Sequence, residues 1–406
     1  MVLRQEYLQQ LMDWKDERVI KVVSGIRRCG KSTLLQQFQG YLIHHGVSKE
    51  QIIALNFEDL DLEPLLQYRN LYDYLKERLC ENQMTYIFLD EIQKVHSFQK
   101  VVDSLYIKEN VDLYITGSNA YLLSGDLATL LTGRYVEISM LPLSYREYCE
   151  AADSPPSDEM FSDYLKYGGF PYIANMERTE EKADMYLEGI YNTVIINDIE
   201  ERQSRKETDP SKRKINDLAL LKSIAKYLAS VIGSPVSVKG ITDYLVSNGR
   251  KVSPNTVGDY TTALTESFVF YPAERYDLVG KQILKANKKY YMVDLGIRNH
   301  ILPRDQYDLG FSIENIVYFE LLRRKYRVHI GKYNNAEIDF VAEKQGSVEY
   351  FQVTAAMTAP ETFEREMAPL RSLKDNYPKT VLTLDRLTLG NYDGILVKNI
   401  QDWLVS

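Results

Sequence analysis

Cysteine is scarce in this chain, and long apolar runs are missing from it. Three cysteines (Cys29, Cys80 and Cys149) occur among 406 residues without paired spacing, so neither a disulfide framework nor a zinc site is indicated. No apolar run reaches the roughly 18–20 residues that a membrane span requires. The N-terminal segment 1–18 is charged throughout and lacks the apolar core of a signal peptide. We therefore expect a protein of the reducing cytoplasm that has no membrane partner.

A dominant basic charge is also lacking. Lys and Arg number 49 against 57 Asp and Glu, which gives a formal net charge of −8 at pH 7. Any contact with DNA or RNA would therefore have to come from a local patch. The hydrophobic share of 45% and the charged share of 26% are those of a soluble globular protein. A chain of this length exceeds one ordinary core, and we expect about two to four domains.

A phosphate-binding pattern stands near the N-terminus. The segment 25–33 reads GIRRCGKST and matches G-x-x-x-x-G-K-[ST]. The β-rich run 19–23 precedes it, and the segment 33–38 continues with helical spacing. This motif requires that order of strand, loop and helix, so the pattern predicts a nucleotide site rather than a simple turn.

The loop residues have separate expected roles. Gly25 and Gly30 permit the backbone angles that turn amide groups toward phosphate oxygens, at the positive end of a helix. Lys31 would reach the β- and γ-phosphates of ATP, and Ser32 would ligate Mg²⁺. The predicted nucleotide-binding residues of the loop are Gly25, Arg28, Cys29, Gly30, Lys31, Ser32 and Thr33.

A pair of acids follows a second apolar run. Residues 86–89 form a continuous apolar segment, which is typical of a strand buried on both faces of a parallel sheet. Asp90 at its carboxyl end would hold Mg²⁺ directly or through water, and Glu91 would polarise the attacking water. Alone, this acidic pair would be read as a turn or a helix cap. Together with the segment 25–33, it predicts the hydrolysis of ATP to ADP and phosphate.

Further polar residues come after the short apolar run 113–116. Ser118 or Asn119 would sense the γ-phosphate, or would form a turn and a helix N-cap. Arg134 would stabilise charge on the transferred phosphate, either in its own chain or on a neighbouring copy in a homo-oligomer. The alternative for Arg134 is a structural surface residue.

Five motifs in this order resemble those of bacterial and archaeal AAA+ superfamily ATPases, in the subgroup with an uncharacterised C-terminal domain. They are GIRRCGKST, LDEIQ, ITGSN, TGRYVEI and PLSYREY. The resemblance covers nearly the whole chain and implies a P-loop NTPase core with a parallel sheet and a helical lid. The segment 167–173 (YGGFPYI) is similar to a G-x-P motif in related ATPases, which implies that Gly169 and Pro171 would lie near the adenine ring. The alternative for this segment is a turn that ends a helix.

The middle of the chain reads as a lid, a linker and a helical region. The polar break 151–159 would be a hinge, and the helical pattern that follows it to about residue 199 would be the lid. The segment 201–217 mixes basic and acidic residues, and it would be an exposed linker or a strip that contacts phosphates.

Three helical segments and two strand-like segments then predict a winged helix. They are residues 218–230, 237–249, 253–268, 269–278 and 288–294. The third helix would expose Asn255, Thr256, Asp259 and Thr262, which offer no arginine fork for guanine. A structural or regulatory role is therefore the alternative to DNA recognition.

The C-terminal region resembles the PD-(D/E)xK nuclease fold. In that fold an acid on a helix, an acid on a strand and an acid-x-lysine on the next strand gather Mg²⁺ and activate water. Glu314 matches the helix acid and Asp339 the strand acid, with Glu337 on the same face of its strand.

The third position departs from the nuclease pattern. The sequence has Gln352 and Thr354 where the acid and the lysine are expected. Threonine cannot replace an ammonium group, so we expect a nuclease-like fold with lost or crippled cleavage. Lys332 or Lys344 could take the lysine's place only by moving into the site.

The sequence thus predicts an α/β protein of four parts. They are a P-loop AAA+-like core (1–150), a helical lid and linker (151–205), a winged-helix domain (206–300) and a small, catalytically degenerate nuclease-like domain (301–406). The favoured function is an Mg²⁺-dependent ATPase switch or motor that couples its nucleotide state to the later domains. The alternative is an ATP-gated module that binds nucleic acid, and a third reading is a relay for a protein partner that the sequence does not identify.

Overall fold

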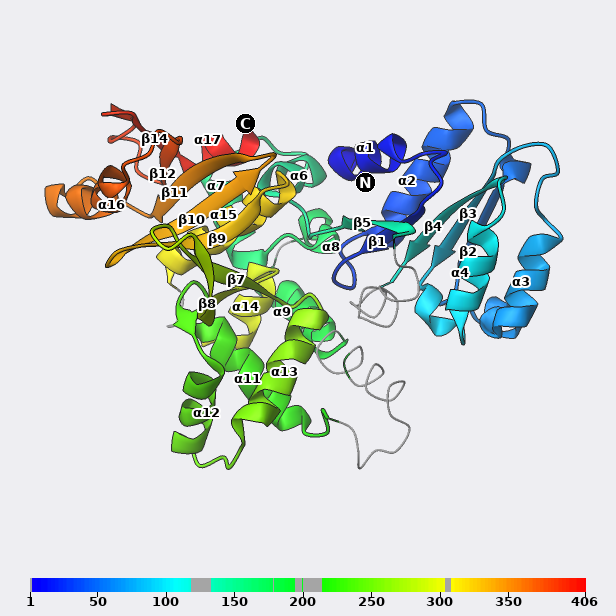
Figure 1. Cartoon of the computed structure of the whole chain (residues 1–406), viewed down its shortest axis with the longest axis horizontal. Coiled ribbons are helices and arrows are strands. Elements are labelled where there is room, and N and C mark those ends of the chain that lie inside the picture. The colour runs from blue at the N-terminus through cyan, green and yellow to red at the C-terminus, as the bar shows by residue number, and fades with distance from the viewer. Residues whose placement is uncertain (1, 118–132, 178, 194–198, 200–213, 304–307) are drawn as a thin grey trace. The chain divides into compact units, whose positions relative to one another are not determined.

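The computed structural model describes residues 2–117, 133–177, 179–193, 199, 214–303 and 308–406. Their contacts divide into two compact units (Figure 1). Unit 1 is Met1–Pro142 with Glu266–Phe268, and unit 2 is Leu143–Thr265 with Val269–Ser406. Among the described helices, none is both long and apolar enough to cross a lipid bilayer.

Unit 1 is built on a five-stranded parallel sheet in the order β2-β3-β4-β1-β5. The strands are β1 (Ile20–Ser24), β2 (Ile52–Asn56), β3 (Thr85–Asp90), β4 (Val111–Thr116) and β5 (Tyr135–Ser139). The helices are α1 (Gln5–Asp13), α2 (Lys31–His44), α3 (Tyr68–Lys76) and α4 (Phe98–Tyr106), with short 3-10 turns η1 (Lys49–Gln51), η2 (Leu60–Leu66) and η3 (Ile92–Lys94). This sheet confirms the predicted α/β class.

Both faces of the sheet are covered, which explains why its central strands are mostly apolar. Alternate residues of a strand point to opposite faces. Phe88 of β3 contacts Phe38 of α2, whereas Ile87 and Leu89 pack with residues of α3 and α4 in one apolar cluster. Every residue of β1 and β3 is buried. Since all five strands are parallel, the carboxyl ends of β1, β3 and β4 meet at one edge of the sheet.

Unit 2 contains a nine-stranded mixed sheet in the order β13-β14-β12-β11-β10-β9-β7-β8-β6. The strands are β6 (Pro235–Val236), β7 (Phe270–Asp277), β8 (Gln282–Met292), β9 (Arg327–Tyr333), β10 (Ala336–Lys344), β11 (Ser347–Thr354), β12 (Lys379–Thr383), β13 (Gly390–Tyr392) and β14 (Ile395–Asn399). The helices are α6 (Tyr145–Ala151), α7 (Asp158–Tyr167), α8 (Pro171–Asn175), α9 (Glu180–Tyr191), α11 (Leu218–Ser230), α12 (Val238–Ser247), α13 (Pro254–Glu266), α14 (Leu295–Ile301), α15 (Leu309–Arg323), α16 (Pro360–Ser372) and α17 (Ile400–Val405).

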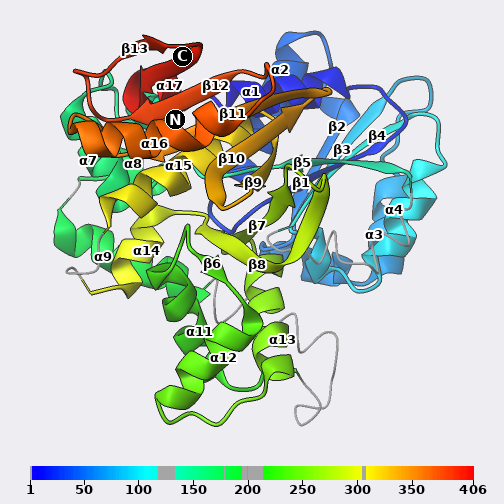
Figure 2. The ribbon, with the colours of Figure 1, turned by 60° about the vertical axis from the view of Figure 1, so that its left-hand side comes forward.

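The hairpin β7–β8 joins two regions that the sequence predicts as separate domains. Helices α11, α12 and α13 lie together beside this hairpin (Figure 2). β7 also pairs in parallel with β9, so the hairpin continues the C-terminal sheet. The boundary predicted at residue 300 therefore falls between strands of one sheet, and the division into four domains stays a prediction.

Candidate functional site

The phosphate-loop segment bends sharply between β1 and α2. Gly25 has a φ of +142°, and a Cβ there would lie 2.1 Å from the carbonyl oxygen of Met140. Gly30 is the N-cap of α2 with a φ of +105°, so Ser32 and Thr33 lie in the first helical turn. Only glycine adopts these angles without strain, and at Gly25 a larger residue would also collide with the backbone.

The Lys31 side chain folds back over its own loop. It is buried, with an exposed fraction of 4%. Its Nζ donates to the carbonyl oxygens of Gly25 and Ile26, at 3.0 and 3.2 Å. These acceptors are neutral, and an ammonium group forms stronger hydrogen bonds with charged phosphate oxygens. The Lys31 ammonium is thus held inside the loop by weak acceptors that phosphate oxygens can replace.

A buried arginine, which the sequence analysis missed, holds the backbone of the phosphate loop. Arg4 donates from Nη1 to the carbonyl oxygen of Cys29 at 3.1 Å and from Nη2 to that of Leu141 at 2.8 Å. The Cys29 side chain is fully buried, and this burial raises the pKa of its thiol. The position of Cys29 in the loop is thus fixed through its backbone and its packing. Of the two arginines in the loop, Arg27 pairs with Glu58 at 2.6 Å, and Arg28 is exposed.

The two predicted Mg²⁺ ligands are brought together at the carboxyl edge of the sheet. The Asp90 carboxylate ends β3 and accepts a hydrogen bond from the Thr116 hydroxyl of β4, and the Ser32 hydroxyl of α2 lies close enough to it to lower its pKa. Burial raises the pKa of Asp90, and the two hydroxyl donors oppose that rise. Ser32 and Asp90 are 58 residues apart in sequence, so their contact follows from the strand order. Thr116 is a residue of this site that sequence reasoning passed over in favour of Ser118 and Asn119.

Glu91 is held in a strained and specific conformation. Its φ of +53° is in the left-handed region, which a non-glycine residue occupies only when its surroundings fix it. Its N–H donates to the Thr116 hydroxyl oxygen at 3.0 Å, and its Oε2 accepts a hydrogen bond from the Gln93 side-chain amide. The carboxylate that is predicted to polarise water is therefore tethered by Gln93, a residue whose only sequence signal is its place in LDEIQ.

Arg134 is not brought to this edge. It precedes β5, which runs parallel to β1, and its carbonyl oxygen accepts from the N–H of Ile20 at the start of β1. The five residues of β5 span about 16 Å, so Arg134 lies at the opposite edge of the sheet from Lys31. There its guanidinium pairs with Asp103 at 3.2 Å and lies over the Tyr106 ring.

The remaining predicted nucleotide contacts lie elsewhere. Ser118 and Asn119 are outside the described residues. Pro171 belongs to unit 2, where it is the first residue of α8. The glycines before it are explained within unit 2, because the Gly169 N–H donates to Asp294 Oδ2 at 2.6 Å and a Cβ on Gly168 would lie 2.1 Å from Asp294 Oδ1. The approach of Pro171 to an adenine ring stays a prediction.

The four residues predicted for a nuclease-like site gather in unit 2 around a lysine that the sequence analysis missed. Lys289 of β8 is 3% exposed, and its Nζ lies 3.0 Å from Glu314 Oε1 and 2.9 Å from Glu337 Oε1. Glu314 Oε1 also accepts from the Tyr291 hydroxyl at 2.6 Å. Of the two alternative lysines, Lys344 lies over the Tyr326 ring, whereas Lys332 of β9 is paired in register with Glu337 of β10.

The other two predicted residues continue this cluster. Asp339 Oδ2 accepts from the Val353 N–H at 2.8 Å, and the Asp339 N–H donates to Gln352 Oε1 at 3.4 Å. Gln352 in turn donates to Glu366 Oε2 at 3.3 Å. Burial, with the negative charge of Glu314, raises the pKa of Asp339 to about 8.

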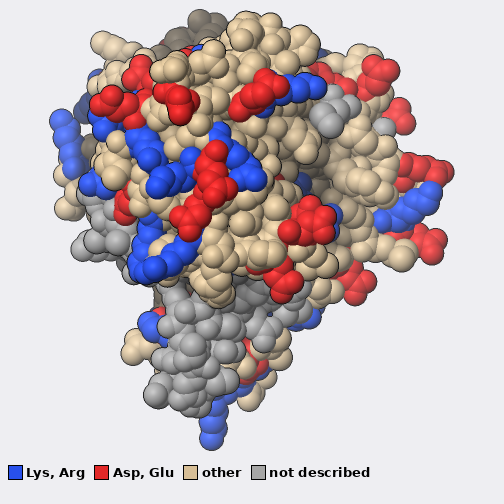
Figure 3. All heavy atoms as spheres, turned by 90° about the vertical axis from the view of Figure 1, so that its right-hand side faces the viewer, with Lys and Arg blue, Asp and Glu red and all other residues tan. Residues whose placement is uncertain are grey.

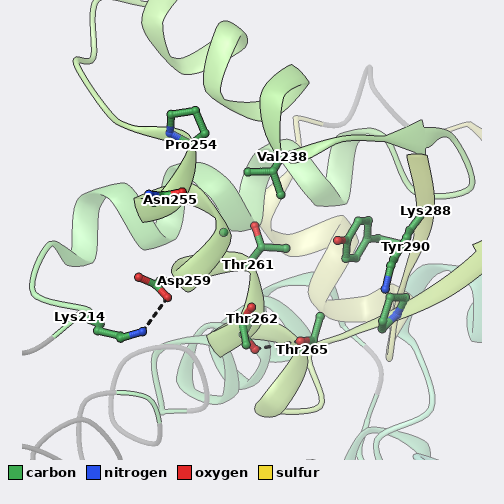
Figure 4. Close-up of a pocket in the computed structure, with 12 residues that line it drawn as sticks. Lys214, Val238, Pro254, Asn255, Asp259, Thr261, Thr262, Thr265, Lys288 and Tyr290 are labelled. Carbon is green, nitrogen blue, oxygen red and sulfur yellow. Dashed lines mark hydrogen bonds and ion pairs between the residues drawn. The ribbon is translucent and has the colours of Figure 1, made fainter. Parts of the chain in front are cut away.

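A polar groove of about 680 Å³ runs along α13 and β8. Figure 4 shows Asn255, Asp259 and Thr262 of α13 on its wall, three of the four residues predicted for the exposed face of this helix. Two lysines also line it, and both are paired: Lys214 with Asp259 at 3.1 Å and Lys288 with Glu274 at 2.9 Å. On the face drawn in Figure 3, positive and negative side chains are interspersed rather than separated.

Two protein-family models match the chain. Residues 17–149 match the family described as "AAA domain", and residues 158–308 match a domain of unknown function (DUF8612). An uncharacterised protein of Haemophilus influenzae is 40% identical over 411 residues, covering 100% of this chain and 99% of that protein. The uncharacterised protein MJ1544 of Methanocaldococcus jannaschii is 28% identical over 342 residues, covering 79% of this chain and 71% of that protein.

Two solved structures share low similarity with the chain. The Walker-type ATPase of Pyrococcus abyssi has a TM-score of 0.46 and 17% identity, covering 74% of this chain and 96% of that chain. The Orc1 protein of Aeropyrum pernix in complex with DNA has a TM-score of 0.30 and 13% identity, covering 74% of this chain and 92% of that chain. Both scores fall below the level that supports a functional comparison.

Proposed function

Because this chain belongs to the same family as the Haemophilus influenzae protein and carries an AAA domain, we propose that it binds ATP and hydrolyses it with Mg²⁺. The observation that carries the proposal is the convergence at the carboxyl edge of the sheet. Lys31 and Ser32 of one segment meet Asp90 and Glu91 of another, and the hydroxyl of Thr116 joins the two acids.

The donor set at this edge fits Mg²⁺. Hard oxygen donors suit this ion, and the Ser32 hydroxyl and the Asp90 carboxylate supply them side by side. When bound, Mg²⁺ would neutralise charge that develops on the phosphate oxygens.

The chain's own residues account for the remaining steps. The Lys31 ammonium exchanges the carbonyl oxygens of Gly25 and Ile26 for phosphate oxygens, and the loop amides and the helix N-terminus hold the phosphates. Glu91 orients water and accepts its proton once the tether from Gln93 is released. Thr116 keeps both residues in place during this change, because its hydroxyl donates to the Asp90 carboxylate and accepts from the backbone N–H of Glu91.

Two substitutions test this assignment. We expect Lys31→Ala to abolish ATP binding, and Glu91→Gln to retain binding while losing turnover. Binding is measured with a fluorescent ATP analogue and turnover by phosphate release. Glu77→Gln, at an exposed glutamate of unit 1, is the matched control and should change neither. Normal turnover in the Glu91→Gln variant would show that another group activates the water.

A second candidate function is an ATP-gated contact with nucleic acid. The order of α11, α12, α13 and the β7–β8 hairpin follows that of a winged helix, and the polar groove lies on its third helix. Against it, both lysines of the groove are already paired. Labelled duplex is titrated with and without ATP at several salt concentrations, because phosphate contacts weaken steeply with salt. No salt-sensitive binding under any nucleotide condition would remove this candidate, and DNA-stimulated ATP turnover would support it.

A further inference from the structure

Lys289 is at the centre of the acids that a nuclease-like reading assigns to a metal. Its ammonium contacts Glu314 of α15 and Glu337 of β10, while Lys289 itself comes from β8. The neighbouring residue Lys288 points to the other face of β8 and lines the groove, as the alternation of a strand requires. Two adjacent lysines thus have different surroundings, and only Lys289 is buried among carboxylates.

The residues of this centre do not fit Mg²⁺. That ion requires near-octahedral oxygen coordination at about 2.0–2.1 Å. Here Glu314 and Glu337 both hold the ammonium, and one oxygen of Asp339 is directed at the Val353 N–H. Within the described part of the chain, no group of three or more acidic, histidine or cysteine side chains has the arrangement of a metal site.

The ammonium is instead matched to its surroundings. Burial alone would disfavour a charged lysine, yet the Lys289 Nζ lies 3.0 Å from a carboxylate oxygen of Glu314 and 2.9 Å from one of Glu337. Glu314 is further satisfied by the Tyr291 hydroxyl, so the buried ions form several hydrogen bonds to polar partners. A buried ion pair is tolerated under this condition, whereas removing one partner leaves an uncompensated charge.

We propose that this centre is a cation site that the chain fills itself, with the Lys289 ammonium in the place where a nuclease would hold a divalent metal. The domain then takes up no divalent metal here and lacks metal-dependent cleavage. The same ammonium fastens the β7–β8 hairpin to α15 and β10. This inference stands whether or not unit 1 hydrolyses ATP.

Mn²⁺ uptake tests the proposal. All proteins carry Asp90→Asn and are free of nucleotide, so that the ATP site contributes no metal binding. Mn²⁺ is followed by the loss of its free electron paramagnetic resonance signal. The parent should bind no Mn²⁺ in unit 2, and Lys289→Ala should gain one ion per chain at about millimolar affinity or tighter. Adding Glu337→Gln should remove the gain, and Lys288→Ala should bind as little as the parent.

Two results would overturn the proposal. One is stoichiometric Mn²⁺ binding by the parent that Asp339→Asn abolishes, since the centre would then be a metal site. The other is a folded Lys289→Ala variant, with the parent's circular dichroism, that gains no ion. Should Lys289→Ala fail to fold, the measurements on the parent and its Asp339→Asn variant decide, since both retain the lysine.

Discussion

Replacing Asp294 by asparagine tests whether burial or hydrogen bonding controls this carboxyl group. Asp294 accepts from the N–H groups of Gly169 and Ile297, which alone would lower its pKa. Burial outweighs these donors and raises the pKa of Asp294 from 3.8 to about 6. The folded state therefore binds the proton more tightly than the unfolded state.

The sign and size of the effect follow from this difference. Between pH 3.8 and about 6 the folded state carries more protons, so raising the pH through this window lowers the stability of unit 2. A shift of about 2 pKa units corresponds to about 3 kcal/mol. Asp294→Asn also loses an acceptor, which costs about 1–3 kcal/mol at every pH. At pH 4 the variant should therefore be clearly less stable than the parent. Between pH 4 and pH 7 the parent should lose about 3 kcal/mol of stability that the variant keeps, so at pH 7 the variant should be nearly as stable as the parent or more stable.

The two tryptophans allow unit 2 to be followed alone. Trp14 lies in unit 1 and Trp403 in unit 2, so a Trp14→Phe background reports on the unfolding of unit 2. Urea unfolding is measured by fluorescence from pH 4 to pH 7. Ser237→Ala, which removes a non-titrating N-cap of α12, should be offset by about 1 kcal/mol at all pH values. A difference for Asp294→Asn that grows as the pH rises would refute the argument, because the carboxyl would then have a lowered pKa.

Three further outcomes are expected. Thr116→Val should retain ATP binding and reduce turnover about tenfold or more, since both acidic residues lose a hydroxyl that positions them. Thr85→Val, at the opposite end of β3, should leave turnover unchanged. Turnover of both variants is measured by phosphate release. Arg4→Met should weaken ATP binding about tenfold, because it loses charged hydrogen bonds to the loop that contribute about 1.5 kcal/mol. Binding is measured by titration with a fluorescent ATP analogue. An unchanged affinity would contradict the supporting role of Arg4. Gly169→Ala should destabilise unit 2 by about 1–3 kcal/mol, because its Cβ would lie 2.5 Å from the Leu143 carbonyl oxygen. A Cβ at Gly189 would meet open space, so Gly189→Ala should leave the stability of unit 2 unchanged. The stability of both variants is measured by Trp403 fluorescence during urea unfolding.

The core of the nucleotide site was predictable because its signals are local. The loop from Gly25 to Ser32 requires a strand before it and a helix after it, and both can be read within about 20 residues. Asp90 and Glu91 follow an apolar strand, and the carboxyl ends of parallel strands meet at one edge. Contact between Ser32 and Asp90 then needs only the assumption of a parallel sheet.

Arg134 shows where this reasoning stops. A residue before a strand lies at the amino edge if that strand runs parallel to its neighbours, and at the carboxyl edge if it runs antiparallel. The sequence does not state the direction of 135–139, and the pairing of β5 with β1 fixes it as parallel. A role in the same chain is therefore not supported, and a role in a neighbouring copy stays a prediction.

Lys289 was beyond sequence reasoning for a different reason. Alternation along a strand predicts that one of two adjacent lysines is buried, but it does not say which one. The choice depends on β7 pairing with β9, which brings Lys289 of β8 to Glu314 of α15 and Glu337 of β10, 25 and 48 residues further along the sequence. The nuclease pattern placed its lysine at position 354, and the fold supplies an ammonium from another strand.

The two buried lysines show why burial alone does not identify a ligand site. Lys31 and Lys289 are 4% and 3% exposed, so they are equally removed from water. The partners of Lys31 are the carbonyl oxygens of Gly25 and Ile26, which are neutral and exchange for an incoming phosphate at little electrostatic cost. The partners of Lys289 are carboxylates, and removing its ammonium would leave the buried charge of Glu314 uncompensated. The charge of its partners therefore distinguishes a buried lysine that can bind an anionic ligand from one whose ammonium is already paired with carboxylates.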